Sequence, residues 1–394
     1  MREYMLVMLV AAAACYMTAG LWRRVAVRAG AMATVRDRDV HTNPTPYLGG
    51  VAMVVGVGVA FLLASRLPWL STHAMVRHDS LGIFLAALVI CVVGAIDDAI
   101  DLPVLTKVFG QILAAGVAVY YGVRMYWISL PGSVYALDTV ASTAITVVFI
   151  FVCVNAINLV DGLDGLAAGV VGIGASALFS YTYFLAHEEN LVVATTASLT
   201  TVTISGVCLG FLPHNAHPAK MFMGDSGSMV LGLLLACSTI SYTGQMDSSV
   251  LGSSITGRGA LPGWLPLILP FAIMFLPLLD MVMAYMRRTI HGKWWFQADK
   301  QHLHHRLLER GHTQVSAVLV MWAWTATIAY GVMGISLFHN KVVWVLVSLA
   351  FVGCSIATLT PWWRKRQAAL RPDRDAPGGV PTRDGSVERA SMLG

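Results

Sequence analysis

The sequence is poor in charged side chains. Asp, Glu, Lys and Arg make up 12% of its 394 residues, about half of the roughly 25% that is usual in soluble domains. This scarcity excludes a solvated globular protein, a disordered chain and a nucleic-acid-binding protein, and the net charge of +5 is too small for a polyanion-binding surface. Apolar residues instead reach 57%, with a mean hydropathy of +0.69. This composition indicates a protein that crosses a lipid bilayer many times.

Paired cysteines are also absent. The six cysteines occur singly within apolar stretches, and no Cys-x-x-Cys pair is found. Disulfide frameworks and zinc sites are recognised by closely and regularly spaced cysteines, so the sequence supports neither. We expect all six to be small core residues: Cys15, Cys91, Cys153, Cys208, Cys237 and Cys354.

Apolar stretches long enough to cross a bilayer recur along the chain. A bilayer core about 30 Å thick needs roughly 20 apolar residues per helix, and stretches near that length occur about eleven times. We therefore expect an all-α integral membrane protein, with about 11 transmembrane helices in one polytopic membrane domain at residues 1–361. The expected spans are 4–22, 48–64, 80–96, 103–121, 139–157, 165–186, 191–211, 226–243, 264–286, 315–337 and 342–360.

Basic residues are distributed unevenly between the loops. Most of the 26 Lys and Arg residues follow odd-numbered spans, and cytoplasmic loops carry the excess of these residues. We therefore expect the N-terminus outside and the C-terminus in the cytoplasm. Residues 362–394, rich in Arg, Pro, Gly and Asp, are expected to form a disordered basic cytoplasmic tail.

A first acidic motif ends the third span, with Asp97, Asp98 and Asp101 close together. Adjacent carboxylates at a helix C-terminus repel each other and the negative end of the helix dipole, unless a cation or a proton compensates. The motif therefore favours a metal or proton-transfer role over a merely solvated loop.

A second motif, residues 155–165, lies between the fifth and sixth spans. Asn155, Asn158 and Asp161 are three residues apart, so one helical turn stacks their oxygens on one face. Asp164 could instead cap the next helix. We favour a functional role for the motif over capping.

A third motif, residues 213–227, precedes the eighth span. Asp225 and Ser226 fit an ordinary helix N-cap, yet a helix N-terminus near glycine and Lys220 is also a phosphate site. Phe222 could stack on a nucleobase or face lipid.

A fourth motif follows the ninth span and contains three histidines. Imidazoles alone suggest zinc, but the carboxylates and amides of the other motifs suit Mg²⁺ or Mn²⁺ better. The histidines and arginines then fit phosphate binding or proton transfer, with a purely structural cluster as the alternative. Asp280 is expected to pair with Arg287. The motif comprises Arg287, Arg288, Asp299, Lys300, His302, His304 and His305.

All four motifs follow odd-numbered spans, so the expected topology places them together on the cytoplasmic face. Oxygen ligands for a hard cation, basic groups for phosphate and an aromatic ring for a base are typical of phosphoryl transfer from a nucleotide to a lipid. One alternative is a nucleotide-sugar or lipid-linked-sugar transporter, but transporters place ionisable groups near the bilayer midplane. The other is a membrane pyrophosphohydrolase, which would not depend on a lipid acceptor.

At these motifs the sequence resembles the polyprenyl-phosphate N-acetylhexosamine-1-phosphate transferases, glycosyltransferase family 4. The resemblance covers about residues 43–310 and includes residues 44–50, 97–98, 155–165, 222–225 and 302–305. Residues 298–305 are most similar to the branch that uses UDP-GlcNAc. An Asp-Asp-x-x-Lys pattern of the branch that uses UDP-MurNAc-pentapeptide has Asp101 in place of lysine here. Whether Lys107 supplies that charge is left open.

The resemblance implies transfer of GlcNAc-1-phosphate from UDP-GlcNAc to a polyprenyl phosphate, decaprenyl or undecaprenyl, with release of UMP. Mg²⁺ (or Mn²⁺) would bridge the pyrophosphate, and the enzyme would work at the cytoplasmic face of a bacterial inner (plasma) membrane. A homodimer is left open. We favour direct attack by the lipid phosphate over an aspartyl-phosphate intermediate, because an anionic nucleophile mainly needs charge screening.

The resemblance also implies residue roles. Asp225 corresponds to the principal metal ligand and Asp161 to its helper, while Asp97 corresponds to the base for the lipid phosphate, with Asp98 beside it. Asp164, Asn215 and Phe222 correspond to the uridine pocket. The remaining residues with implied catalytic or substrate-binding roles are Lys107, Asn158, Arg288, His302, His304 and His305.

Overall fold

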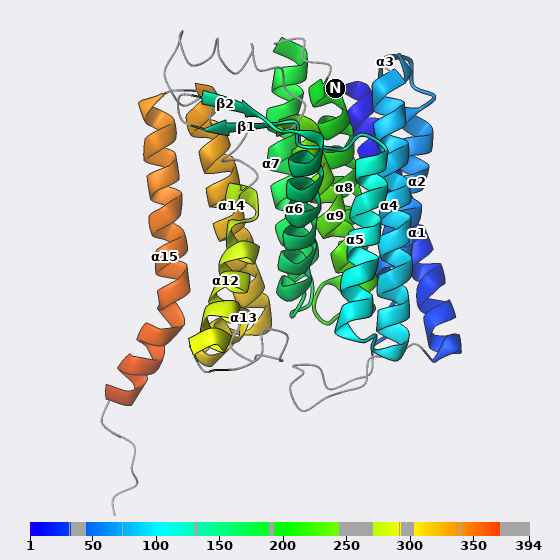
Figure 1. Cartoon of the computed structure of the whole chain (residues 1–394). Coiled ribbons are helices and arrows are strands. Elements are labelled where there is room, and N and C mark those ends of the chain that lie inside the picture. Colours follow the sequence, from blue (N-terminus) through cyan, green and yellow to red (C-terminus); the bar gives the residue numbers. More distant parts are fainter. Residues whose placement is uncertain are drawn as a thin grey trace, which may run out of the picture.

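Long helices stand side by side in the computed structural model of this chain (Figure 1). It describes residues 1–30, 32, 45–72, 74–130, 133–188, 193–243, 271–290, 292, 303–338 and 340–370. The helices are α1 (Arg2–Ala29), α2 (Gly49–Ala64), α3 (Pro68–Ser71), α4 (Ala74–Ile100), α5 (Val104–Tyr120), α6 (Thr139–Val160), α7 (Leu166–Glu188), α8 (Val193–Asn215), α9 (Gly224–Thr243), α12 (Phe275–Ile290), α13 (Leu303–Glu309), α14 (Gln314–Phe338) and α15 (Lys341–Leu370).

The helices confirm the expected fold class, an all-α protein of the membrane. Eight of those described are long and apolar enough to cross a bilayer, and α2 and α5 are shorter apolar helices. The expected span 264–286 is described only from residue 271 onward. The total of eleven spans and the orientation remain predictions, as does the division at residue 361, past which α15 continues to Leu370.

A short hairpin that the sequence analysis did not predict joins α5 to α6. Strand β1 (Trp127–Leu130) pairs antiparallel with β2 (Ser133–Ala136), with Trp127 opposite Ala136. In Figure 1 the hairpin lies at the upper end of the bundle, opposite the end where α4 and α6 finish.

Helices α8 and α9 form the centre of the bundle. Within their apolar windows, 89% of α8 and 94% of α9 is buried, against 6% of α15 at the edge. Both central helices are rich in Gly, Ser, Thr and Ala, and small residues allow membrane helices to pack closely. All six cysteines are buried and unpaired, which confirms their expected role as core residues.

The N-terminus of α9 is held by close backbone contacts with residues 46–50 and with α4. Phe222 donates its N–H to the Pro46 carbonyl at 3.0 Å, and Gly49 and Gly50 donate theirs to the carbonyls of Phe222 and Met223, both at 3.2 Å. A side chain at Gly50 would collide with the backbone of the first turn of α9, and a side chain at Gly94 of α4 would do the same. The position of this turn is therefore fixed by main-chain packing.

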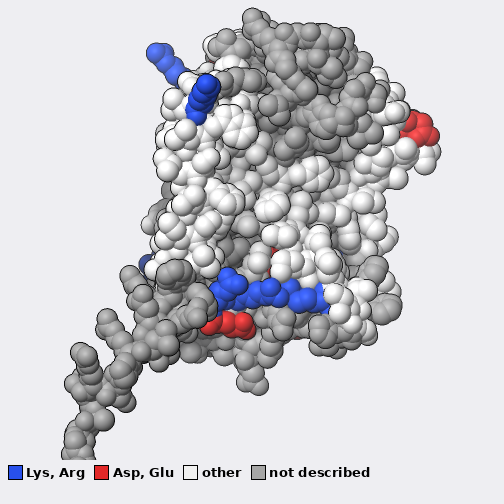
Figure 2. Space-filling view, turned by 90° about the vertical axis from the view of Figure 1, so that its left-hand side faces the viewer, with Lys and Arg blue, Asp and Glu red and all other residues white. Residues whose placement is uncertain are grey.

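Charge is concentrated near the ends of the bundle. On the face in Figure 2, the middle of the molecule is almost free of charged residues, and Lys and Arg gather in a band near the lower end and again at the top. An uncharged belt between charged ends is what a bilayer requires, because a charge in the hydrocarbon core is costly.

Candidate active site

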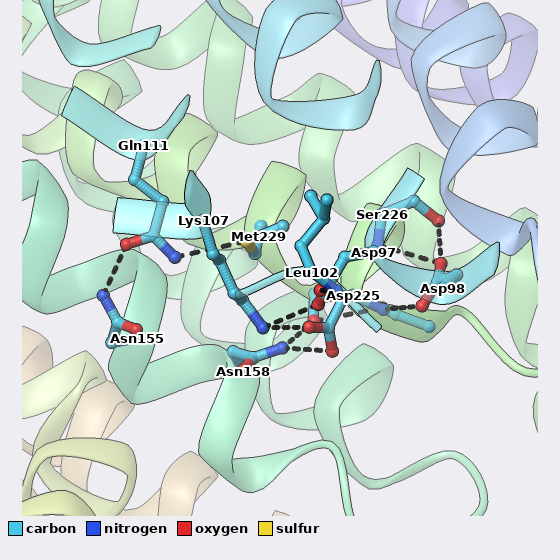
Figure 3. A network of polar contacts seen from close by, with 12 residues as sticks. Asp97, Asp98, Leu102, Lys107, Gln111, Asn155, Asn158, Asp225, Ser226 and Met229 are labelled. Carbon is cyan, nitrogen blue, oxygen red and sulfur yellow. Dashed lines mark hydrogen bonds and ion pairs between the residues drawn. The ribbon is translucent and has the colours of Figure 1, made fainter. Parts of the chain in front are cut away.

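Four helices bring polar side chains together at the lower end of the bundle (Figure 3). Asp97 and Asp98 lie on the last turn of α4, and Lys107 lies on the first turn of α5. Asn158 lies on the last turn of α6, and Asp225 lies on the first turn of α9. The sequence analysis named all five as site residues, and the fold brings them into one network.

Lys107 joins two carboxylates. Its ammonium Nζ lies 3.0 Å from Oδ2 of Asp97 and also forms an ion pair with Asp225. Asp97 in addition accepts the Leu102 N–H at 2.8 Å through Oδ1. The ammonium thus reduces the repulsion between the two carboxylates, and Lys107 supplies a cation near the acidic motif although Asp101 occupies the lysine position of the related pattern.

Asp98 caps helix α9 from the end of α4. Its Oδ1 accepts the Asp225 N–H at 2.7 Å, and its Oδ2 accepts the N–H and the hydroxyl of Ser226 at 3.2 and 2.9 Å. Free N–H groups at a helix N-terminus favour a carboxylate partner. This contact was not foreseen, because capping partners were sought only among neighbours in the sequence.

Two residues of the second motif also interact with this cluster, one through hydrogen bonds and the other through its charge. Asn158 donates its side-chain N–H groups to Oδ1 of Asp225 at 2.8 Å and to the Ser228 hydroxyl at 2.9 Å. Asp161 follows directly on the end of α6. Burial, together with the carboxylates of Asp225 and Asp98, raises the pKa of Asp161 well above the usual value of a carboxyl group.

A second part of the site joins the turn after α6 to the loop before α9. Asp164 is buried, accepts the Ala219 N–H at 3.1 Å and pairs with Nδ1 of His217 at 2.8 Å. Asn215 is also buried; its side-chain oxygen accepts the Gly165 N–H at 3.0 Å, and its Nδ2 donates to the Met221 carbonyl at 3.1 Å. Asn215 therefore organises the loop through backbone bonds.

Two further residues belong to this loop region. The ring of Phe222 lies 6.0 Å from that of Tyr47, centroid to centroid. His217 received no role in the sequence analysis, although it lies within the third motif. His217 and Asp164 are far apart in the sequence, so no local pattern predicted the contact between them.

The fourth motif is described in part. Asp280 is buried on α12 and accepts the Leu303 N–H at 2.9 Å, which attaches the start of α13 to α12. The Arg288 guanidinium lies 5.6 Å from the centre of the Tyr285 ring. His305 is half-buried on α13. His302, Asp299, Lys300 and the side chain of His304 lie outside the described residues.

The donor set fits a small hard cation. Among the described residues, no three His, Cys, Asp or Glu side chains form a metal-binding group. Mg²⁺ commonly uses only one or two protein carboxylates and takes its other ligands from water and phosphate. Asp97 and Asp225 bring two carboxylates of this kind to one point, where both contact the Lys107 ammonium.

Comparison with known proteins gives one consistent assignment. The family model "Glycosyl transferase family 4" matches residues 80–243, which include α4 to α9 from residue 80 on. The chain is 40% identical to decaprenyl-phosphate N-acetylglucosaminephosphotransferase of Mycobacterium tuberculosis, over 95% of this chain and 93% of the relative.

More distant relatives are also named as transferases. A probable undecaprenyl-phosphate N-acetylglucosaminyl 1-phosphate transferase of Bacillus subtilis is 34% identical, over 76% of each chain. A phospho-N-acetylmuramoyl-pentapeptide-transferase of Clostridioides difficile is 29% identical, over 75% of this chain and 86% of the relative. The near-complete coverage at 40% identity shows that this chain belongs to glycosyl transferase family 4, the polyprenyl-phosphate N-acetylhexosamine-1-phosphate transferases.

Proposed function

We propose that this chain transfers GlcNAc-1-phosphate from UDP-GlcNAc to a polyprenyl phosphate and releases UMP. The observation that carries the proposal is the 40% identity, over nearly the whole of both chains, to a decaprenyl-phosphate N-acetylglucosaminephosphotransferase. Further relatives at 40% identity are also named for decaprenyl phosphate, so we take decaprenyl phosphate as the acceptor in preference to undecaprenyl phosphate.

The reaction takes place at the end of the bundle that carries the carboxylate cluster, on the cytoplasmic side of a bacterial inner membrane. The basic residues that follow odd-numbered spans support this orientation. The position of Asp97, Lys107 and Asp225 on the terminal turns of their helices supports an enzyme that meets a soluble nucleotide at the membrane surface. It counts against a transporter, whose ionisable groups lie near the midplane.

Mg²⁺ or Mn²⁺ is the cofactor we propose, held by Asp225 with help from Asp161. When bound, it would supply positive charge to the pyrophosphate of the nucleotide sugar. Asn158 fixes the orientation of the Asp225 carboxylate through Oδ1, and Asp98 fixes its backbone. Hydrogen bonds to both its side chain and its main chain thus fix the position of Asp225, the proposed metal ligand.

Asp97 and Lys107 act on the lipid phosphate in this proposal. Asp97 takes the last proton of the phosphate monoester, which leaves a dianionic nucleophile that attacks the β-phosphorus of UDP-GlcNAc as UMP departs. Lys107 lies beside Asp97 and lowers the repulsion between this carboxylate and the incoming anion. Arg288, His302, His304 and His305 are proposed to bind phosphate or sugar.

The uridine pocket is proposed at the junction of residues 161–165 with residues 215–222. Asp164 and Phe222 would contact the base. Asn215 would hold the loop, since its amide already binds the backbone on both sides. His217 orients the Asp164 carboxylate and so belongs to the same pocket.

A transfer assay with the purified protein tests the function. UDP-GlcNAc and UDP-MurNAc-pentapeptide are offered in competition, with decaprenyl phosphate and Mg²⁺ each present or omitted, and UMP and lipid-linked sugar are measured. We expect UMP only when lipid and metal are both present, and GlcNAc in the lipid product. UMP formed without lipid would instead indicate the pyrophosphohydrolase, and activity that survives a chelator would exclude the metal.

A further inference from the structure

A second polar layer lies one helical turn deeper in the bundle than the candidate site (Figure 3). It consists of Gln111 on α5, Asn155 on α6 and Met229 on α9. Each of these residues is three or four positions from a site residue on its own helix, and this spacing places both side chains on the same face. The site residues below them are Lys107, Asn158 and Asp225.

The Gln111 amide joins the three helices at this level. Its Oε1 accepts an N–H from Asn155 at 2.9 Å, and its Nε2 donates to the Met229 sulfur at 3.3 Å. Asn155 donates its other N–H to the Phe151 carbonyl of its own helix at 2.8 Å. Gln111 is 1% exposed and Met229 is fully buried, so the contacts are made within the packed interior.

Stability alone does not require an amide at this position. Burying an amide in an apolar interior is unfavourable unless it is hydrogen-bonded, and replacing both partners of such a bond by apolar groups of the same shape is often nearly neutral or better. An amide differs from an apolar residue because its hydrogen bonds are directional. They fix how neighbouring helices are rotated and how far they slide past each other. Here the three helices so linked each carry one member of the Lys107–Asn158–Asp225 network.

We propose that Gln111 is a positioning residue of the transferase. Through Asn155 and Met229 it sets the register of α5, α6 and α9, and thereby the separation of Lys107, Asn158 and Asp225 one turn below. It touches neither the reacting groups nor the cation. The inference rests on the proposed function for its kinetic consequence, but its structural consequence, the geometry of the cation-binding oxygens, can be measured separately.

The test replaces Gln111 by methionine, Gln111→Met, which keeps the length of the side chain and removes both bonds. Two quantities are measured on the full-length protein in detergent: Mn²⁺ affinity by electron paramagnetic resonance without substrates, and turnover at saturating Mn²⁺. Losing a residue that supports a metal site typically costs roughly ten- to a hundredfold in affinity or activity. We expect a loss of that size in Mn²⁺ affinity, with at most a small fall in the apparent melting temperature from the Asn155 N–H that loses its acceptor.

Two controls separate positioning from general damage. Thr182→Val removes a buried bond with Ser198, 2.9 Å long, between α7 and α8, and should leave Mn²⁺ affinity unchanged. The exchange Gln111→Asn with Asn155→Gln preserves the combined side-chain length, so the double variant should regain at least part of the affinity lost in Gln111→Asn alone.

Wild-type Mn²⁺ affinity in Gln111→Met would overturn the proposal. So would a loss that appears only together with a lower melting temperature and that the double exchange does not restore. If the wild-type protein fails to transfer GlcNAc-1-phosphate while the Mn²⁺ results hold, the proposed function fails and the positioning role of Gln111 stands.

Discussion

Lys107 and Asp225 form an ion pair across 118 positions of sequence. Lys107 lies on the first turn of α5 and Asp225 on the first turn of α9, so the pair connects the N-terminal turns of two helices. Asp97, at the end of α4, binds the same ammonium. The positive charge that two facing carboxylates require thus comes from the chain itself, from a lysine ten residues beyond Asp97.

The first prediction concerns that charge. Lys107→Met should lower kcat/KM on the order of 100-fold, because a preorganised positive group beside a reacting phosphate contributes at about this scale. Lys107→Arg should retain more activity than Lys107→Met, since it keeps the cation, although its planar group fits the space differently. Steady-state transfer at saturating Mg²⁺ measures this, and wild-type kcat/KM in Lys107→Met would contradict the assignment.

The second prediction separates the two carboxylates that Lys107 joins. Asp225→Asn should raise the Mg²⁺ concentration needed for half-maximal activity, because it weakens the proposed metal ligand. Asp97→Asn should reduce turnover even at saturating Mg²⁺, because it removes the proposed base. Metal titrations of both variants distinguish the two roles. An identical dependence on metal in the two variants would show that the roles of metal ligand and base are wrongly assigned.

The third prediction concerns Asp98 as a cap. Asp98→Ala leaves two N–H groups of α9 without their acceptor, and losing an N-cap costs about 1 kcal/mol. For a chain of 394 residues we expect the apparent melting temperature to fall by roughly 1–2 °C. Ser226→Ala removes only the hydroxyl contact and should have a smaller effect. An unchanged melting temperature with abolished turnover in Asp98→Ala would point to a direct catalytic role instead.

The fourth prediction concerns pH. A carboxyl group with a raised pKa keeps its proton to higher pH, so a proton competes with a divalent cation for Asp161 over a range where ordinary carboxylates are ionised. Mn²⁺ affinity should therefore continue to rise with pH above the range where ordinary carboxylates titrate. Asp161→Asn should flatten this dependence. Equal slopes in wild type and Asp161→Asn would exclude Asp161 from the metal site.

Much of this arrangement could be predicted from the sequence. Apolar stretches near 20 residues long predicted the helices, and clustered Asp and Asn residues in an otherwise uncharged protein indicated residues that the fold brings into one network. The hairpin at residues 127–136 was missed, although a Pro-Gly pair between two short β-branched and aromatic stretches is a turn signal.

Contacts between distant helices could not be predicted in the same way. Helical spacing shows that Gln111 and Lys107 share a face, but it does not say which helix that face meets. An uncharged glutamine inside an apolar stretch carries no signal of its own, and Gln111 was therefore overlooked. The capping of α9 by Asp98 depends on how α4 and α9 cross, which no local pattern encodes.

The burial of all six native cysteines has a practical consequence for measuring the orientation. Water-soluble thiol reagents should leave the wild-type chain unmodified, so a single introduced cysteine reports its own location without a cysteine-free background. Asp101→Cys, just beyond the end of α4, should resist such a reagent in intact cells and react once the membrane is opened. Because the native thiols are buried, a spin label or a fluorophore can also be attached to a cysteine introduced at any exposed position along the lower rim.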